Sequence, residues 1–196
     1  MKKKSLILVM IMAIGLILCS CGSDTAESTI QSHSPNEDEQ MIASLLKQSD
    51  ADVALMDYSA PAGAKSITVG YDVFTRGKLT QKNQDQLTTG VVDESKTGMI
   101  GVSLGKKDSL ISVAGDDGSA GSASGENPWK KNSLKSSASA ELSAPVNVEM
   151  KTKVYFFCHL ENKGDEIEGI TPDAIQEDPG CLKDIEKAYV YYAIFN

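Results

Sequence analysis

Alternation of apolar and polar residues with a period of two is the feature of this sequence that most restricts its fold. Between residues 67 and 73, apolar side chains occupy every second position, and the pattern ends at Arg76-Gly77. Successive side chains of a β-strand point to opposite faces of a sheet, so this stretch predicts a strand with one buried face.

Four later stretches also favour strands. Residues 99–104 and 110–114 are short apolar stretches separated by a segment containing Gly, which predicts a hairpin. Residues 146–160 keep apolar side chains at even positions except at Thr152, which predicts one long strand or two strands joined by a bend. Residues 189–195 are apolar on both parities, which is typical of a central strand covered on both sides.

Helices and loops are expected to be few. Ser34-Pro35 followed by Glu37 is typical of a helix start with a Ser cap and Pro in the first turn, and an apolar stripe follows, so the stretch from Ser34 to about Lys47 predicts a short N-terminal helix. Residues 115–125 are Gly, Ser, Ala and Asp, and we expect a mobile loop there. A short helix is expected near residues 182–187.

Short strands in series predict a mainly β domain. The expected architecture is an antiparallel β-sandwich of about seven strands, either immunoglobulin-like or jelly-roll-like. The strand order is not predicted.

The start of the chain has the layout of a secretory signal. Three lysines precede an uncharged apolar stretch over residues 6–18. This stretch is shorter than the roughly 20 residues of a spanning helix. The following Leu18-Cys19-Ser20-Cys21 resembles the lipobox of bacterial lipoproteins. That resemblance implies cleavage before Cys21 and diacylglycerol on its sulfur, with palmitate-type acyl chains that anchor the protein in the cell membrane, facing the extracellular side.

Three segments follow from this reading. Residues 1–20 are the signal peptide, residues 21–36 are a disordered tether of mostly polar residues, and residues 37–196 are one globular domain. Cleavage removes three lysines and no acid, so the net charge changes from −8 to about −11. An acidic chain is repelled by nucleic acid, which is therefore excluded as a partner.

Two cysteines remain after Cys19 is removed and Cys21 is acylated. Cys158 and Cys181 can form a disulfide outside the cytoplasm, which would stabilise the fold by about 3 kcal/mol in the chain-entropy model. Cys158 is also in phase with the apolar residues of its predicted strand, where a free thiol serves as a small core residue. Both alternatives remain open at this point.

No catalytic constellation, metal site or cofactor motif can be identified in the sequence. Its two histidines are His33, in the predicted tether, and His159, alone on a predicted strand, whereas a zinc site or a catalytic triad needs several groups in fixed geometry. The acid pairs 165–166 and 177–178 lie in loop-like segments. A hydrolase would have to use such loop carboxylates.

Aromatic residues are the candidate ligand contacts. Tyr155 and Phe157 share a predicted strand face with His159, Tyr191 shares one with Tyr189, and Trp129 follows the predicted loop. Tyr and Trp anchor peptides and stack on sugars. The alternative is that the strand aromatics form the core.

The stretch from Ala60 to Tyr71, the tripeptide Gly77-Lys78-Leu79 and the final Ala188-Tyr189-Val190-Tyr191-Tyr192 resemble small lipoproteins of Gram-positive bacteria. The resemblance implies a location at the cell surface and a β-rich domain. We therefore expect a non-catalytic surface module that binds an envelope polysaccharide or a protein partner. The alternative is a cell-wall or carbohydrate hydrolase that uses loop carboxylates.

Overall fold

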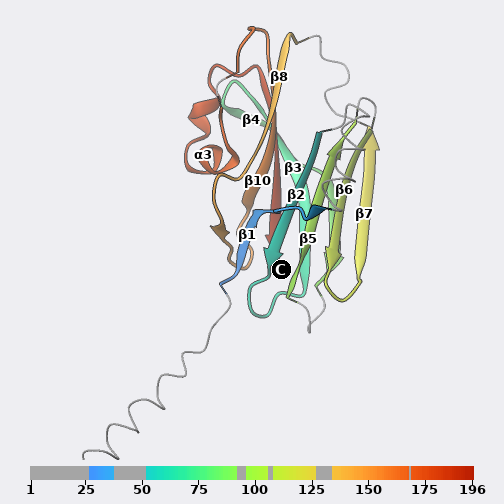
Figure 1. The fold of residues 1–196 in the computed structure, drawn as a ribbon. Helices are drawn as coiled ribbons and strands as arrows, with labels where there is room; N and C mark the ends of the chain where they lie inside the picture. Colours follow the sequence, from blue (N-terminus) through green and yellow to red (C-terminus); the bar gives the residue numbers. More distant parts are fainter. Residues whose placement is uncertain (1–26, 38–51, 92–95, 106–107, 127–133, 168) are drawn as a thin grey trace, which may run out of the picture.

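A computed structural model describes residues 27–37, 52–91, 96–105, 108–126, 134–167 and 169–196. Within these ranges the chain forms two antiparallel sheets packed face to face (Figure 1). The predicted β-sandwich is confirmed. The predicted N-terminal helix lies outside the described residues beyond Glu37, and its expected start at 34–36 is not helical. Cys21 and Trp129 also lie outside the described residues.

The first sheet, called sheet A, has the order β7-β6-β5-β2-β1-β9. Its strands are β1 (Thr29–Ser32), β2 (Asp52–Ser59), β5 (Thr97–Leu104), β6 (Asp108–Gly115), β7 (Ala120–Glu126) and β9 (Val146–Asn147). β5 and β6 pair from Gly98↔Gly115 to Leu104↔Ser109, which confirms the predicted hairpin.

The second sheet, called sheet B, has the order β4-β3-β11-β10-β8. Its strands are β3 (Ser66–Thr75), β4 (Lys78–Gly90), β8 (Ser136–Glu141), β10 (Val154–Asn162) and β11 (Lys187–Phe195). β3 and β4 are joined by Arg76-Gly77, where φ is positive at both residues, as a tight two-residue hairpin turn requires.

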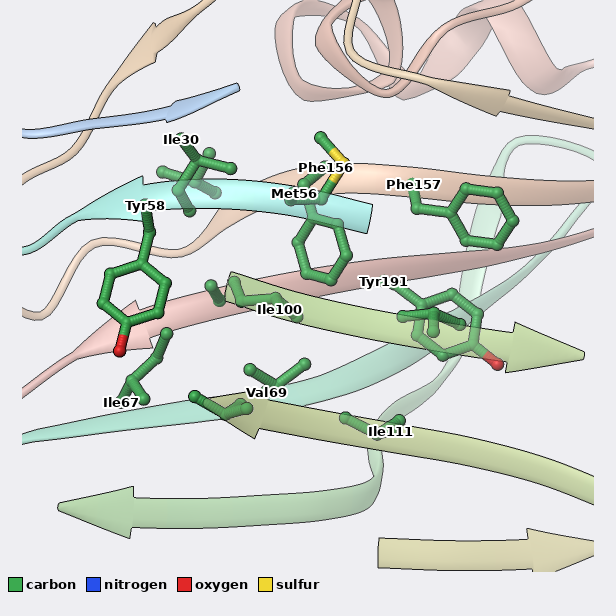
Figure 2. Packing of buried hydrophobic residues seen from close by; sticks show 14 of the residues in the cluster. Ile30, Met56, Tyr58, Ile67, Val69, Ile100, Ile111, Phe156, Phe157 and Tyr191 are labelled. Atoms are coloured by element: carbon green, nitrogen blue, oxygen red, sulfur yellow. The ribbon is translucent and has the colours of Figure 1, made fainter. Parts of the chain in front are cut away.

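Two apolar clusters lie on opposite faces of sheet B. The larger one fills the space between the sheets and includes Ile30, Met56, Ile100, Phe156 and Tyr191 (Figure 2). The smaller one lies under α3 (Pro172–Glu177) and the 3-10 helix η1 (Pro179–Leu182). β11 is therefore covered on both sides, as its unbroken apolar sequence predicts.

Several sequence predictions are wrong in position. Residues 120–126 form strand β7, although residues 115–125 were expected to be a loop. The tether prediction fails at β1, whose Ile30 is fully buried between β2 and β9. Helical turns occur at residues 172–182, whereas a helix was expected near residues 182–187.

The stretch 146–160 divides into β9 in sheet A and β10 in sheet B. Within β10 a register shift between Tyr155 and Phe157 places both Phe156 and Phe157 in the cluster between the sheets. Tyr155, Cys158 and Leu160 face the other cluster. The predicted common face of Tyr155 and Phe157 is therefore wrong, because the bulge inverts the parity of the strand.

Candidate functional site

The outer face of sheet A carries a hollow of about 240 Å³ across β1, β2 and β5. We call it the β1–β2–β5 hollow. Polar side chains line it, together with Tyr58 and Gly98. The lining residues are Thr29, Gln31, Asp57, Tyr58, Ser59, Thr97, Gly98 and Asp116.

Strand register brings the polar side chains of the hollow together. Gln31 pairs with Asp57, and Ser59 pairs with Thr97, so two rows of polar residues lie next to each other. These odd-numbered residues point outward because Ile30 and Met56, next to them in sequence, are buried in the core.

Contacts within the protein fix the two carboxylates of the hollow. Nδ1 of His33 lies 2.7 Å from Oδ1 of Asp57. The Thr97 hydroxyl donates a hydrogen bond to Asp116, whose backbone N–H bonds back to the Thr97 carbonyl at 3.2 Å. Next to them, burial and then the charges of Asp116 and Asp117 raise the pKa of the Tyr58 phenol.

The hollow therefore offers hydroxyl, amide and carboxylate groups in one small area. Such groups donate to and accept from neutral ligands that carry many hydroxyl or amide groups. Carboxylates at 57 and 116 disfavour an anionic ligand, since like charges repel.

A second polar constellation, called the Asp72 cluster, lies on the outer face of sheet B. Asp72 is 1% exposed and accepts hydrogen bonds from Lys153 Nζ at 2.7 Å, the Tyr155 hydroxyl at 2.8 Å and the Asn83 backbone N–H at 2.9 Å. Lys153 Nζ also lies 3.8 Å from the centre of the Tyr192 ring.

The backbone of β4 is irregular where it meets this cluster. φ is 55° at Asn83 and 43° at Asp85, and the pairing of β3 with β4 shifts register around Tyr71 and Val73. These bulges direct Asn83 toward Lys153 and Asp85 toward the Tyr71 hydroxyl, at 3.1 Å each.

The polar groups of the Asp72 cluster are hydrogen-bonded to one another. Both carboxylate oxygens of Asp72 accept hydrogen bonds from the protein, and Lys153 donates to Asp72 and Asn83. It links four strands of sheet B and, through the contact of Gln176 with the Tyr155 backbone, helix α3. We therefore assign it to stability rather than to ligand binding.

Asp52, Ser139 and His159 form a third constellation, which has the residue types of a catalytic triad but a different geometry. The Ser139 hydroxyl lies 3.0 Å from Nδ1 of His159 and donates to Asp52 at 2.7 Å. Asp52 approaches the same ring nitrogen, at 3.7 Å. In a triad the serine and the acid bind opposite nitrogens of the imidazole, so this arrangement is not one.

The strand aromatics expected to contact a ligand are buried. Phe157 and Tyr191 point into the space between the sheets, with ring centres 5.6 Å apart (Figure 2). Tyr155 is 8% exposed and bonds to Asp72. All three side chains are therefore packed in the apolar clusters, as the core-packing alternative expects, and contact of these residues with a ligand stays a prediction.

Cys158 and Cys181 are free thiols in the structure, so the alternative of a disulfide between them is not realised here. Cys158 is buried, and burial raises the pKa of its thiol to about 12. Its neighbour Cys181 is half-buried.

Of the carboxylates considered for hydrolysis, Asp178 accepts a hydrogen bond from Gly180 at the start of η1. Within the described ranges, no group of three or more His, Cys, Asp or Glu side chains is arranged to hold a metal ion.

Sequence reasoning did not find the β1–β2–β5 hollow. Its residues come from four separate stretches of the chain, and two of the residues, Thr29 and Gln31, fall in the predicted tether. The one available signal was Ile30, a β-branched residue within a polar run.

In comparisons with protein families, with curated proteins and with solved structures, nothing matches this chain. No helix of the described part is long and apolar enough to cross a membrane.

Proposed function

We propose that this chain is a lipid-anchored cell-surface protein whose β-sandwich is a non-catalytic binding module. The anchoring rests on the signal layout and on Cys21 at the lipobox position. Two acyl chains on one cysteine give stable membrane attachment, whereas a single chain gives only marginal binding.

The β1–β2–β5 hollow is the observation that carries the binding proposal. It combines an open position on a sheet face with hydroxyl, amide and carboxylate side chains. Those groups favour a neutral, hydroxyl-rich ligand, such as an envelope polysaccharide, or the backbone of a protein partner.

The experiment uses residues 22–196, which retain β1 but lack the anchor, on arrays of polysaccharides and peptidoglycan fragments. We expect binding without turnover. Replacing Gln31 and Ser59 together by Ala should weaken binding about tenfold, the loss expected for about 1.4 kcal/mol of hydrogen bonding. Ser122→Ala, on the same sheet face but outside the hollow, should have no effect.

Two results would contradict this proposal. Unchanged binding in the Gln31→Ala, Ser59→Ala variant would remove the hollow as the site. Turnover of a glycan that is abolished by a single Asp or Glu substitution would instead establish the hydrolase alternative.

A further inference from the structure

β1 enters the fold at one defined end of the sandwich. The Ser28 hydroxyl donates to the Ala60 carbonyl at 3.4 Å, and the Val148 N–H donates to the Ser28 carbonyl at 2.9 Å. Ala60 begins the connection between β2 and β3, and Val148 follows β9.

The C-terminus lies at the same end (Figure 1). The Asn196 carbonyl accepts hydrogen bonds from Lys65 at 2.6 Å and Ser66 at 3.0 Å, and the Lys151 N–H donates to the Phe195 carbonyl at 2.7 Å. We call this end, formed by residues 60–66, 148–151 and 195–196, the entry end. The hairpin turn at Arg76-Gly77 lies at the opposite end of β3, which we call the far end.

The chain between the proposed anchor and the fold is short. Seven residue steps separate Cys21 from Ser28, and a fully extended chain advances at most about 3.6 Å per residue, so the link spans at most about 25 Å. The predicted tether of residues 21–36 would have allowed more than twice this reach.

The sandwich is longer than this link. β3 has 10 residues, which corresponds to about 33 Å at about 3.3 Å per residue. Placing the far end on the bilayer with the strands upright would lift Ser28 about 33 Å above it, beyond the reach of the link.

We propose that the entry end is the membrane-facing surface of this protein and that the far end points away from the bilayer. This inference rests on the proposed acylation of Cys21. The entry end faces the lipid surface as its partner, and the covalent anchor keeps the entry end at that surface.

Charge does not select the orientation by itself. Exposed Lys65 and Lys151 at the entry end are accompanied by the acidic turn residues Asp116 and Asp117, which follow β6 near Thr97. Attraction to anionic headgroups is therefore offset by repulsion. The orientation should depend on link length and be insensitive to the anionic lipid content.

The orientation also places the β1–β2–β5 hollow on the membrane side of the molecule. Thr29, Ser59 and Thr97 form its row nearest to Ser28 and Ala60. A ligand in the hollow is held near the bilayer rather than at the far end of the domain.

The test measures energy transfer from single fluorophores on the acylated, full-length protein to a headgroup-labelled lipid in phosphatidylcholine vesicles. In a Cys181→Ser background, whose remaining Cys158 is buried, the labels are placed by Ala62→Cys at the entry end, Ser122→Cys in the middle of β7 and Lys78→Cys at the far end. Transfer should fall in that order, with the entry-end value at least about twofold above the far-end value, because the strands separate the two labels by about 30 Å.

A lengthened link provides the matched control. Inserting 20 Gly and Ser residues between Ser23 and Asp24 should reduce the difference, since the domain could then rotate freely. Equal transfer from all three labels on the natural link, or the reverse order, would overturn the inference while leaving the anchoring intact. Failure of the protein to float with vesicles would instead overturn the anchoring and, with it, the orientation.

Discussion

At the scale of single residues, two buried tyrosines differ in what their hydroxyl groups contact. The Tyr155 hydroxyl donates to the buried carboxylate of Asp72, whereas the Tyr191 hydroxyl has no hydrogen-bond partner among the described residues. Burial raises the pKa of both phenols, and the bond to Asp72 adds to the effect at Tyr155. Both hydroxyls therefore stay protonated at neutral pH.

Conservative replacement by Phe should separate the two tyrosines. Tyr155→Phe removes a hydrogen bond to a buried charge and should lower the free energy of unfolding by about 1.5 to 3 kcal/mol. Tyr191→Phe should change it by less than about 0.5 kcal/mol or stabilise the protein, because the hydroxyl is desolvated without a compensating bond. Urea denaturation measures both, and an equal loss in the two variants would contradict the assigned contacts.

The two thiols of the domain should react at different rates. Cys158 is fully buried with a raised pKa, and the thiolate is the reactive form, so alkylation at neutral pH should modify Cys181 first and Cys158 only on unfolding. Mass spectrometry after limited exposure to iodoacetamide measures this. A mass two hydrogens lower, restored by reductant, would show that the two cysteines are bridged.

At the scale of elements, the sequence predicted strands only where the core imposes an apolar pattern, either alternating or unbroken. β3 and β11 have such patterns because their side chains face apolar clusters. β4 is nearly all polar and exposed, and it becomes a strand because β3 pairs with it. β7 consists of Ala, Gly, Ser and Glu, so neither propensity nor hydrophobicity marks it.

The candidate site was less predictable than the fold, because it depends on register between distant strands. Gln31 of β1 pairs with Asp57 of β2, and Asp57 in turn pairs with Met99 of β5. No local sequence pattern encodes these pairings. A single bulge at Tyr155 also reversed which side chains of β10 face the core. A one-residue shift in a strand moves every later side chain to the opposite face.

β1 provides a test at this scale. Ile30→Ala removes a fully buried side chain between two strands and should cost about 2 to 5 kcal/mol of unfolding free energy. Its exposed neighbour is the control, since Gln31→Ala should change stability by less than about 0.5 kcal/mol. Thermal unfolding of residues 22–196 compares the two variants. Equal stability of both would indicate that residues 29–32 belong to the tether and are not a strand of the folded domain.

At the scale of the whole molecule, the net charge of −8 and the position of β1 both bear on the proposal that the protein is anchored by lipid on Cys21. An acidic domain gains little from anionic lipid, so in this proposal the acyl chains provide the attachment. In that case the short link would keep the sandwich close to the bilayer. Cys21→Ala should release the protein from the membrane fraction or leave it unprocessed, whereas Cys19→Ala should leave acylation intact.

Lipid attachment at Cys21 is the central claim, and the intact mass of the protein extracted from membranes tests it most directly. We predict a chain that begins at Cys21, with the added mass of a diacylglyceryl group on the cysteine. Fragmentation should place that mass on Cys21. An unmodified chain, a different first residue, or incorporation of an acyl-chain probe into the Cys21→Ala variant would contradict the account.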